Sequence, residues 1–128
     1  MKLLLDTHIW LWFLGDRQRL GRRVSQLLQD EGVELWLSPI STWEALTLQE
    51  KGRIKLPGTI AEWAAKATEG FKEAVLTHEI ALASRELRLH EDPSDRMIAA
   101  TAKVLDLTLV TADERLLEFK DIKTLANS

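Results

Sequence analysis

The sequence predicts an α/β protein with a parallel sheet of about four to five strands and helices on both faces. Strand-like segments alternate with helical patterns along the chain, which is typical of parallel sheets. Residues 3–5 form an unbroken leucine run, as expected for a strand that is buried on both faces. Residues 107–111 have the clearest strand pattern in the rest of the chain. A chain of 128 residues is predicted to form one domain, residues 1–128.

Cap and turn residues divide the remainder of the chain. Ser38 and Pro39 indicate a helix start, because Ser is a preferred N-cap and Pro is favoured at the first helical position. Asp92 and Pro93 indicate another, within a loop predicted at residues 90–94. Further strands are predicted at residues 34–37, 71–76 and 122–125, and helices at 7–14, 21–30, 39–51, 59–69, 77–88 and 92–105, with a short last helix ending near 119.

Composition excludes several classes of protein. The chain is 45% hydrophobic and 29% charged, which is the balance of a soluble globular protein, and no apolar run is long enough to span a bilayer. The leucine run is too short for the core of a signal peptide, and Asp6 interrupts it. The absence of Cys excludes disulfides and thiolate metal sites, so any metal must be held by oxygen or imidazole. These features predict a cytoplasmic protein.

Two carboxylates follow predicted strands. Asp6 comes directly after the leucine run, and Asp113 lies just past the strand at 107–111. Ligands of open parallel sheets bind just beyond the carboxyl ends of the strands. If these two strands are neighbours, both acids emerge at the same edge of the sheet.

Two further acids lie on helical faces that are otherwise apolar. Glu44 shares a stripe with Ile40 and Leu48, because residues four apart lie on one face of a helix. Asp95 begins a face of small and apolar residues, namely Ile98, Ala99 and Ala102. Buried carboxylates are rare unless they are paired or bind a metal.

Each acid also has a purely structural interpretation. Asp6 and Asp113 can cap the helices that follow them, and residues 41–44 match a capping box. Asp92 is a good N-cap, and Asp95 three residues later favours the helix dipole.

The joint pattern favours a metal site. Four acids crowded at one edge of a sheet would repel each other unless cations neutralise them. Because oxygen ligands favour Mg²⁺ or Mn²⁺, the pattern predicts such an ion, which can activate water for attack on a phosphodiester.

Four sequence blocks resemble those of the PIN-domain ribonucleases, most closely the VapC type of bacterial toxin. The most specific block is Asp-Pro-Ser-Asp-Arg at residues 92–96, which leads into Ile-Ala-Ala-Thr-Ala at 98–102. The others are Asp-Thr-His at 6–8, Ser-Pro-Ile-Ser-Thr-Trp-Glu at 38–44 and Leu-Val-Thr-Ala-Asp at 109–113. Their order and spacing match over essentially the whole chain.

The resemblance implies a PIN-like fold and a metal-dependent endoribonuclease that acts as the toxin of a toxin–antitoxin pair. It implies a homodimer, an RNA substrate and an antitoxin that blocks the active site. Transfer, messenger and ribosomal RNA all remain open as targets. By motif position, the catalytic and metal-binding set would be Asp6, Glu44, Asp95 and Asp113, of which Asp113 is the most variable in the family, with Thr7, Thr111 and Arg96 in support. Hydrolysis by activated water would leave a 5′-phosphate and a 3′-hydroxyl.

Other residues near these motifs have two interpretations each. His8 is expected to be a packed histidine, because it opens a very apolar helix. Trp10, Trp12 and Phe13 fit either burial within the subunit or a dimer or antitoxin surface. The basic residues are expected to be solvated surface charges, with RNA contact as the alternative; they are Arg22, Arg23, Lys51, Arg53 and Lys55.

Competing functions make different demands on the sequence. A haloacid-dehalogenase phosphatase needs Asp-x-Asp after its first strand, whereas this chain has Asp-Thr-His at residues 6–8. A receiver domain needs an acidic pair and a late Lys, and neither pattern is evident. The remaining alternative is a non-catalytic, doubly wound interaction module whose acids are all helix caps.

Overall fold

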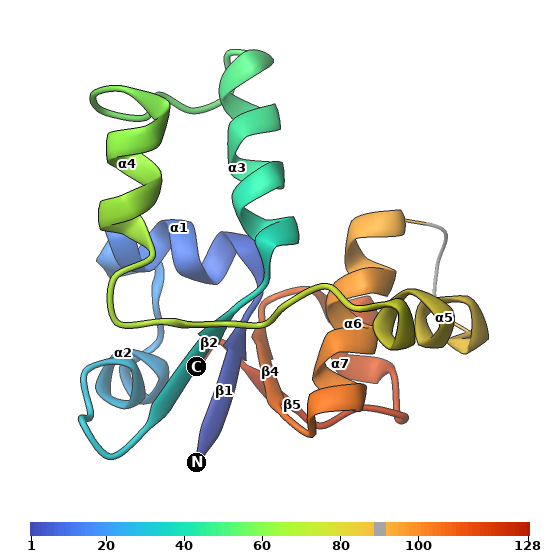
Figure 1. Cartoon of the computed structure of the whole chain (residues 1–128). Coiled ribbons are helices and arrows are strands. Elements are labelled where there is room, and N and C mark those ends of the chain that lie inside the picture. The colour runs from blue at the N-terminus through green and yellow to red at the C-terminus, as the bar shows by residue number, and fades with distance from the viewer. Residues whose placement is uncertain (89–91) are drawn as a thin grey trace.

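The predicted parallel sheet is confirmed by a computed structural model that describes residues 1–88 and 92–128 (Figure 1). The sheet has the strand order β3-β2-β1-β4-β5, and every pair of neighbouring strands is parallel. The strands are β1 Lys2–Leu5, β2 Glu34–Leu37, β3 Lys72–Glu73, β4 Thr108–Thr111 and β5 Thr124–Ala126. Strand order runs outward from β1 through β2 to β3 and then resumes on the other side of β1 at β4, so the topological switch point lies between β1 and β4.

Helices connect the strands and cover the sheet on both sides. On one side lie α1 Thr7–Gly15, α2 Arg22–Leu28, α3 Pro39–Glu50 and α4 Ile60–Ala67, with a 3₁₀ turn at Arg17–Arg19. On the other lie α5 His78–Glu86, α6 Pro93–Leu105 and α7 Glu114–Glu118. Figure 1 shows α3 and α4 standing beyond the sheet with α1 near their base. Part of the loop predicted at 90–94 lies outside the described residues.

The leucine run of β1 explains why this strand is central. Leu3 and Leu5 pack into the cluster on the α1–α4 side, while Leu4 packs into the cluster on the α5–α7 side. All three side chains are fully buried, as a strand with helices on both faces requires. Strand β1 therefore contributes to both hydrophobic cores and ends at the predicted site.

One predicted strand and the expected packing of two apolar side chains need correction. The strand predicted at 71–76 is only β3, an edge strand with two charged residues, and Val75 beyond it is exposed. Short, charged edges discourage further pairing. The helical spacing at residues 59–69 places Ile60 on one face with Trp63, and Leu82 is one of the apolar residues of the helix predicted at 77–88. Both side chains are nevertheless largely exposed. Spacing alone did not distinguish the face that packs from its neighbour. Among the described residues, no helix is long and apolar enough to cross a membrane.

The two-sided burial of β1 predicts a large stability cost for truncation there. Leu4→Ala should lower the free energy of unfolding by about 2–5 kcal/mol, because it removes buried methyl groups and leaves a cavity. Leu82→Ala is the matched control, since Leu82 is 69% exposed; a change within about 0.5 kcal/mol is expected there. Urea unfolding measures both, and equal effects would contradict the assigned packing.

Candidate active site

The switch point of the sheet brings the first and fourth strands together at their carboxyl ends. Leu5 of β1 is in register with Val110 of β4, and the Asp6 N–H donates to the Val110 carbonyl at 3.0 Å. This bond carries the strand pairing to the residue where β1 becomes α1. Asp6 is therefore fixed at the edge where parallel sheets bind their ligands.

The Thr111 hydroxyl links the two strand-end acids. It donates to Asp6 Oδ2 at 2.6 Å and accepts from the Asp113 N–H at 3.0 Å. Thr111 is fully buried, and the Asp6 carboxylate is almost so. The other Asp6 oxygen, Oδ1, accepts from the Thr7 N–H at 2.9 Å and caps α1. Asp6 is thus held through both oxygens while its carboxylate faces the switch point.

Glu44 reaches the same place from α3. The Thr7 hydroxyl donates to Glu44 Oε1. A second hydrogen bond, of 2.9 Å, joins the hydroxyls of Thr7 and Ser41. The capping-box interpretation of residues 41–44 is wrong, because α3 begins at Pro39 and Ser38 is its cap. Thr7 therefore ties α1 to α3 and orients Glu44. The stripe of Ile40, Glu44 and Leu48, expected to face inward, is only partly buried, because α3 packs through Ser41 and Ala45.

The amino end of α6 supplies the remaining acids. Asp92 caps this helix by accepting from the N–H groups of Ser94 and Asp95. Asp92 and Asp95 line a cavity of about 330 Å³ together with the acids described above. The acids that line it are Asp6, Glu44, Asp92, Asp95 and Asp113. The structure therefore brings all four predicted acids together and adds Asp92, which the sequence had placed only as a cap.

Further residues of the cavity were missed or misjudged from sequence. His8 was expected to be packed, but it is exposed and lines the cavity, with its ring 6.1 Å from that of Trp12. Arg115 also lines it, with a guanidinium nitrogen 3.5 Å from Asp113. The sequence signal that could have identified Arg115 is its position two residues after Asp113. Arg96 is not among the residues lining this cavity, and its buried Nε has no hydrogen-bond partner within the described part of the chain.

The electrostatics of Asp6 reflect its burial. Burial raises the pKa of the Asp6 carboxyl above its ordinary value, although hydrogen bonds from Thr111 and Thr7 act in the opposite direction. The nearby charge of Asp113 adds to the increase. The ionised form of Asp6 is therefore disfavoured in the folded protein without a bound cation.

Glu44 behaves like Asp6, whereas Asp113 does not. Burial raises the pKa of Glu44, and the charges of Asp6, Asp95 and Asp92 raise it further. Burial also acts to raise the pKa of Asp113, but hydrogen bonds from Arg115 and the N–H of Leu116 outweigh it and lower that pKa. Two of the carboxylates thus carry unfavourable charge, which is the condition that a bound cation relieves.

The carboxylates of the cavity fit a hard divalent cation by their chemistry, although their oxygens are not arranged as a coordination shell. Within residues 1–88 and 92–128, no three His, Asp or Glu side chains are grouped closely enough to hold a metal ion. The acids nevertheless share one cavity and offer carboxylate oxygens, the ligands that Mg²⁺ and Mn²⁺ prefer. The raised pKa values of Asp6 and Glu44 agree with this fit.

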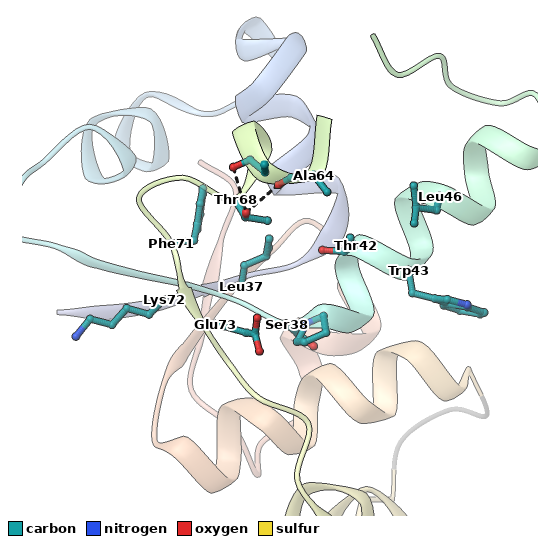
Figure 2. A pocket seen from close by; sticks show the side chains of 12 residues that line it. Leu37, Ser38, Thr42, Trp43, Leu46, Ala64, Thr68, Phe71, Lys72 and Glu73 are labelled. Carbon is teal, nitrogen blue, oxygen red and sulfur yellow. Dashed lines mark hydrogen bonds between the residues drawn. The ribbon is translucent and has the colours of Figure 1, made fainter. Parts of the chain in front are cut away.

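A second hollow, of about 560 Å³, lies between α4 and the start of α3 (Figure 2). Its lining is largely apolar, with Glu73 as the single carboxylate in it. Figure 2 shows Phe71 beside Leu37, while Trp43 points away from the other side chains. Because this hollow lacks convergent acids, the acidic cavity is the better candidate for chemistry.

The fold and the cavity define an α/β protein with an acidic site at the switch point of a parallel sheet. The family described as the PIN domain matches residues 3–123. The chain therefore belongs to the PIN-domain family, as the four sequence blocks predict.

Comparisons with particular proteins agree with this assignment. Ribonuclease VapC22 of Mycobacterium tuberculosis (strain ATCC 25618 / H37Rv) is 34% identical over 116 residues, which cover 89% of this chain and 88% of the relative. Among solved structures, VapBC2 from Rickettsia felis, bound to a promoter DNA fragment, matches with a TM-score of 0.76 and 17% identity over 98% of each chain. DNA-bound VapBC from Salmonella typhimurium matches with a TM-score of 0.71 and 18% identity, covering 100% of this chain and 99% of the other.

The raised pKa of Asp6 predicts that removing its charge stabilises the metal-free protein. Between the ordinary value of 3.8 and the raised value, the folded state holds a proton that the unfolded chain has lost. Stability therefore falls as pH rises through this window, and ionised Asp6 remains unfavourable above it. In EDTA at pH 7, Asp6→Asn should raise the free energy of unfolding, because the neutral amide removes a buried negative charge. Urea or thermal unfolding measures the change.

Asp106→Asn is the matched control for this experiment. The salt bridge to Lys123 lowers the pKa of the exposed Asp106 carboxyl. Asn also tolerates the left-handed backbone at this position, where φ is 53°. No stabilisation is expected from the control, and the gain at Asp6 should disappear in acid, where the carboxyl is protonated. A loss of stability in Asp6→Asn at pH 7 would contradict the electrostatic account.

Proposed function

We propose that this chain is a metal-dependent endoribonuclease of the VapC type and the toxin of a toxin–antitoxin pair. The observation that carries the proposal is the convergence of Asp6, Glu44, Asp95 and Asp113 on one cavity at the switch point of a PIN-family sheet. The 34% identity to a protein named as a ribonuclease supports the reaction class. We treat residues 1–128 as one catalytic domain, acting in the cytoplasm where its RNA substrate occurs.

The four acids would hold one or two Mg²⁺ or Mn²⁺ ions. Bound there, such an ion would supply Lewis acidity toward a phosphodiester and lower the pKa of water. Thr111 fixes the Asp6 carboxylate relative to Asp113, and Thr7 fixes Glu44 relative to Asp6. Both hydroxyls act as positioning groups, because they contact the acids and are themselves buried. A preorganised set of oxygens reduces the rearrangement needed at the moment of reaction.

Helix capping by the acids does not favour the non-catalytic interaction module over the proposed nuclease. Asp6, Asp92 and Asp113 do cap their helices, as that alternative requires. Capping by Asp92 and Asp113 uses one carboxylate oxygen, Oδ1, in each case. The capping acids are also gathered in one cavity rather than dispersed over the surface. The same residues can therefore start helices and bind a cation.

We propose an antitoxin protein and a second copy of the chain as partners. Structures that share this fold include one named as a toxin–antitoxin complex and one named as a member of the VapBC family of toxin–antitoxin systems, which supports the first. Large exposed apolar side chains support the second, namely Trp43, Val75, Leu76 and Leu82. Sedimentation of the purified chain distinguishes a dimer from a monomer.

Purified protein, freed of any antitoxin, should cleave a mixed RNA pool in Mg²⁺ or Mn²⁺ and not in EDTA. Asp6→Asn should lower the rate by about 100-fold or more, because it removes a charged group at the centre of the acid set. Gel analysis of end-labelled RNA gives the rate, and end mapping tests for the expected 5′-phosphate and 3′-hydroxyl. Asp106→Asn should cleave like wild type. Cleavage that persists in EDTA, or in Asp6→Asn, would contradict the assignment.

Metal binding can be tested without RNA. Titration of Mn²⁺ followed by electron paramagnetic resonance should show saturable binding to the wild type. Glu44→Gln should weaken this binding by about tenfold or more, and Thr111→Val by less, because Thr111 acts through Asp6 and Asp113. Asp106→Asn again serves as control. If the wild type shows no saturable binding, the non-catalytic interaction module becomes the better explanation.

A further inference from the structure

A third cavity, of about 740 Å³, adjoins the acidic one along α1. Its walls come from α1, from the carboxyl-terminal half of α3, from the connector at residues 53–57 and from Trp63 of α4. We call it the α1 groove. Figure 1 shows the elements that frame it, with α1 crossing near the base of α3 and α4. The groove therefore occupies the side of α1 that its packing on the sheet leaves open.

His8 and Trp12 connect the groove to the acidic cavity. Both residues line both cavities, so the two cavities lie side by side with His8 and Trp12 between them. Their rings lie 6.1 Å apart with an angle of 56° between the planes. His8 is exposed and Trp12 half-buried. Two ring systems are thus presented at the entrance to the acid set.

The charge of the groove is opposite to that of the acidic cavity. Its lining includes the cations Arg19, Arg53 and Lys55 and a single acid, Asp16. Asp16 pairs with Arg19 at 2.8 Å, and the Arg19 guanidinium lies 5.7 Å from the centre of the Trp12 ring. This cationic patch contrasts with the net charge of −3 on the whole chain. It offers phosphate-binding charge directly beside aromatic surface.

We propose that a single-stranded RNA segment lies in the α1 groove, with its cleavable phosphodiester in the adjoining acidic cavity. Arg53 and Lys55 contact phosphates of the flanking nucleotides, and His8 and Trp12 stack on an unpaired base. Cations that follow a backbone, together with rings that accept bases, are the common means of binding single strands. A duplex hides its base faces and cannot use the rings. This inference rests on the proposed ribonuclease function and names the form of substrate that the site accepts.

Arg53 and Lys55 lie in the α1 groove, whereas the other basic residues considered as RNA contacts lie outside it. Arg22 and Arg23 are exposed on α2, and Lys51 is exposed at the end of α3. None of these three lines the α1 groove or the acidic cavity. They therefore provide variants with the same change in charge at sites outside the proposed path.

The test measures binding of a fluorescein-labelled, 12-nucleotide, mixed-sequence RNA pool by anisotropy, in Mg²⁺ and on the Asp6→Asn background. The double variant Arg53→Gln/Lys55→Gln should raise Kd by about tenfold and reduce the slope of log K against log salt by about 1.4, as loss of two phosphate contacts requires. His8→Ala should raise Kd by about fivefold through lost stacking. The same RNA annealed to its complement should bind more weakly than the single strand.

Matched controls distinguish a path from a general charge effect. Arg22→Gln/Arg23→Gln and His78→Ala, an exposed histidine on α5, should bind the single strand like the parent. Equal losses in groove and control variants, unchanged binding in the groove variants, or preference for the duplex would overturn the proposal. Those results would favour a protein partner for the groove. Cleavage by the wild type is measured separately. If the wild type cleaves RNA but the groove variants bind normally, the RNA path is wrong and the proposed function stands. If the groove variants lose binding but the wild type does not cleave, the RNA path stands and the proposed catalytic activity is wrong.

Discussion

The pairing of β1 with β4 is the constraint on which the candidate site depends. The Thr111 hydroxyl accepts from Asp113 and donates to Asp6, a residue 105 positions earlier in the chain. That contact exists only while Leu5 and Val110 stay in register. A slip of one residue would turn each side chain of the strand to the opposite face and separate the acids. The buried leucines of β1 oppose such a slip, because each is committed to one of the two cores.

Burial of the acids opposes stability while it prepares the site. Asp6 and Glu44 both have raised pKa values, so the folded chain would be more stable with neutral side chains there. The hydrogen bonds from Thr7 and Thr111 offset part of this cost and also fix the carboxylates. An acid that only capped a helix would gain nothing from such burial. This cost is therefore easier to explain by a bound cation than by capping.

Sequence patterns predicted the central strands and the placement of the acids better than they predicted which side chains are exposed. Unbroken leucines and strand–helix alternation are local signals, and they placed the central strands and the acids at the sheet edge. The exposure of His8 depends on which side of α1 remains open after α3 and the 53–57 connector are in place. Leu82 is exposed for a similar reason, because α5 packs through the face that carries Ile80 and Ser84. Which side of an apolar helix stays open is a tertiary property that periodicity does not contain.

The opposite charges of the two cavities suggest how substrate binding and catalysis are coupled. Without a cation, the carboxylates around Asp6 repel a phosphodiester, whereas the groove beside Lys55 attracts one. On the proposed function, a strand held only by the groove would keep its reacting phosphate out of the acidic cavity until that cavity is neutralised. Cation and RNA would then each raise the affinity for the other, because linkage between two ligands is reciprocal. His8 and Trp12, shared by both cavities, lie where this coupling would act.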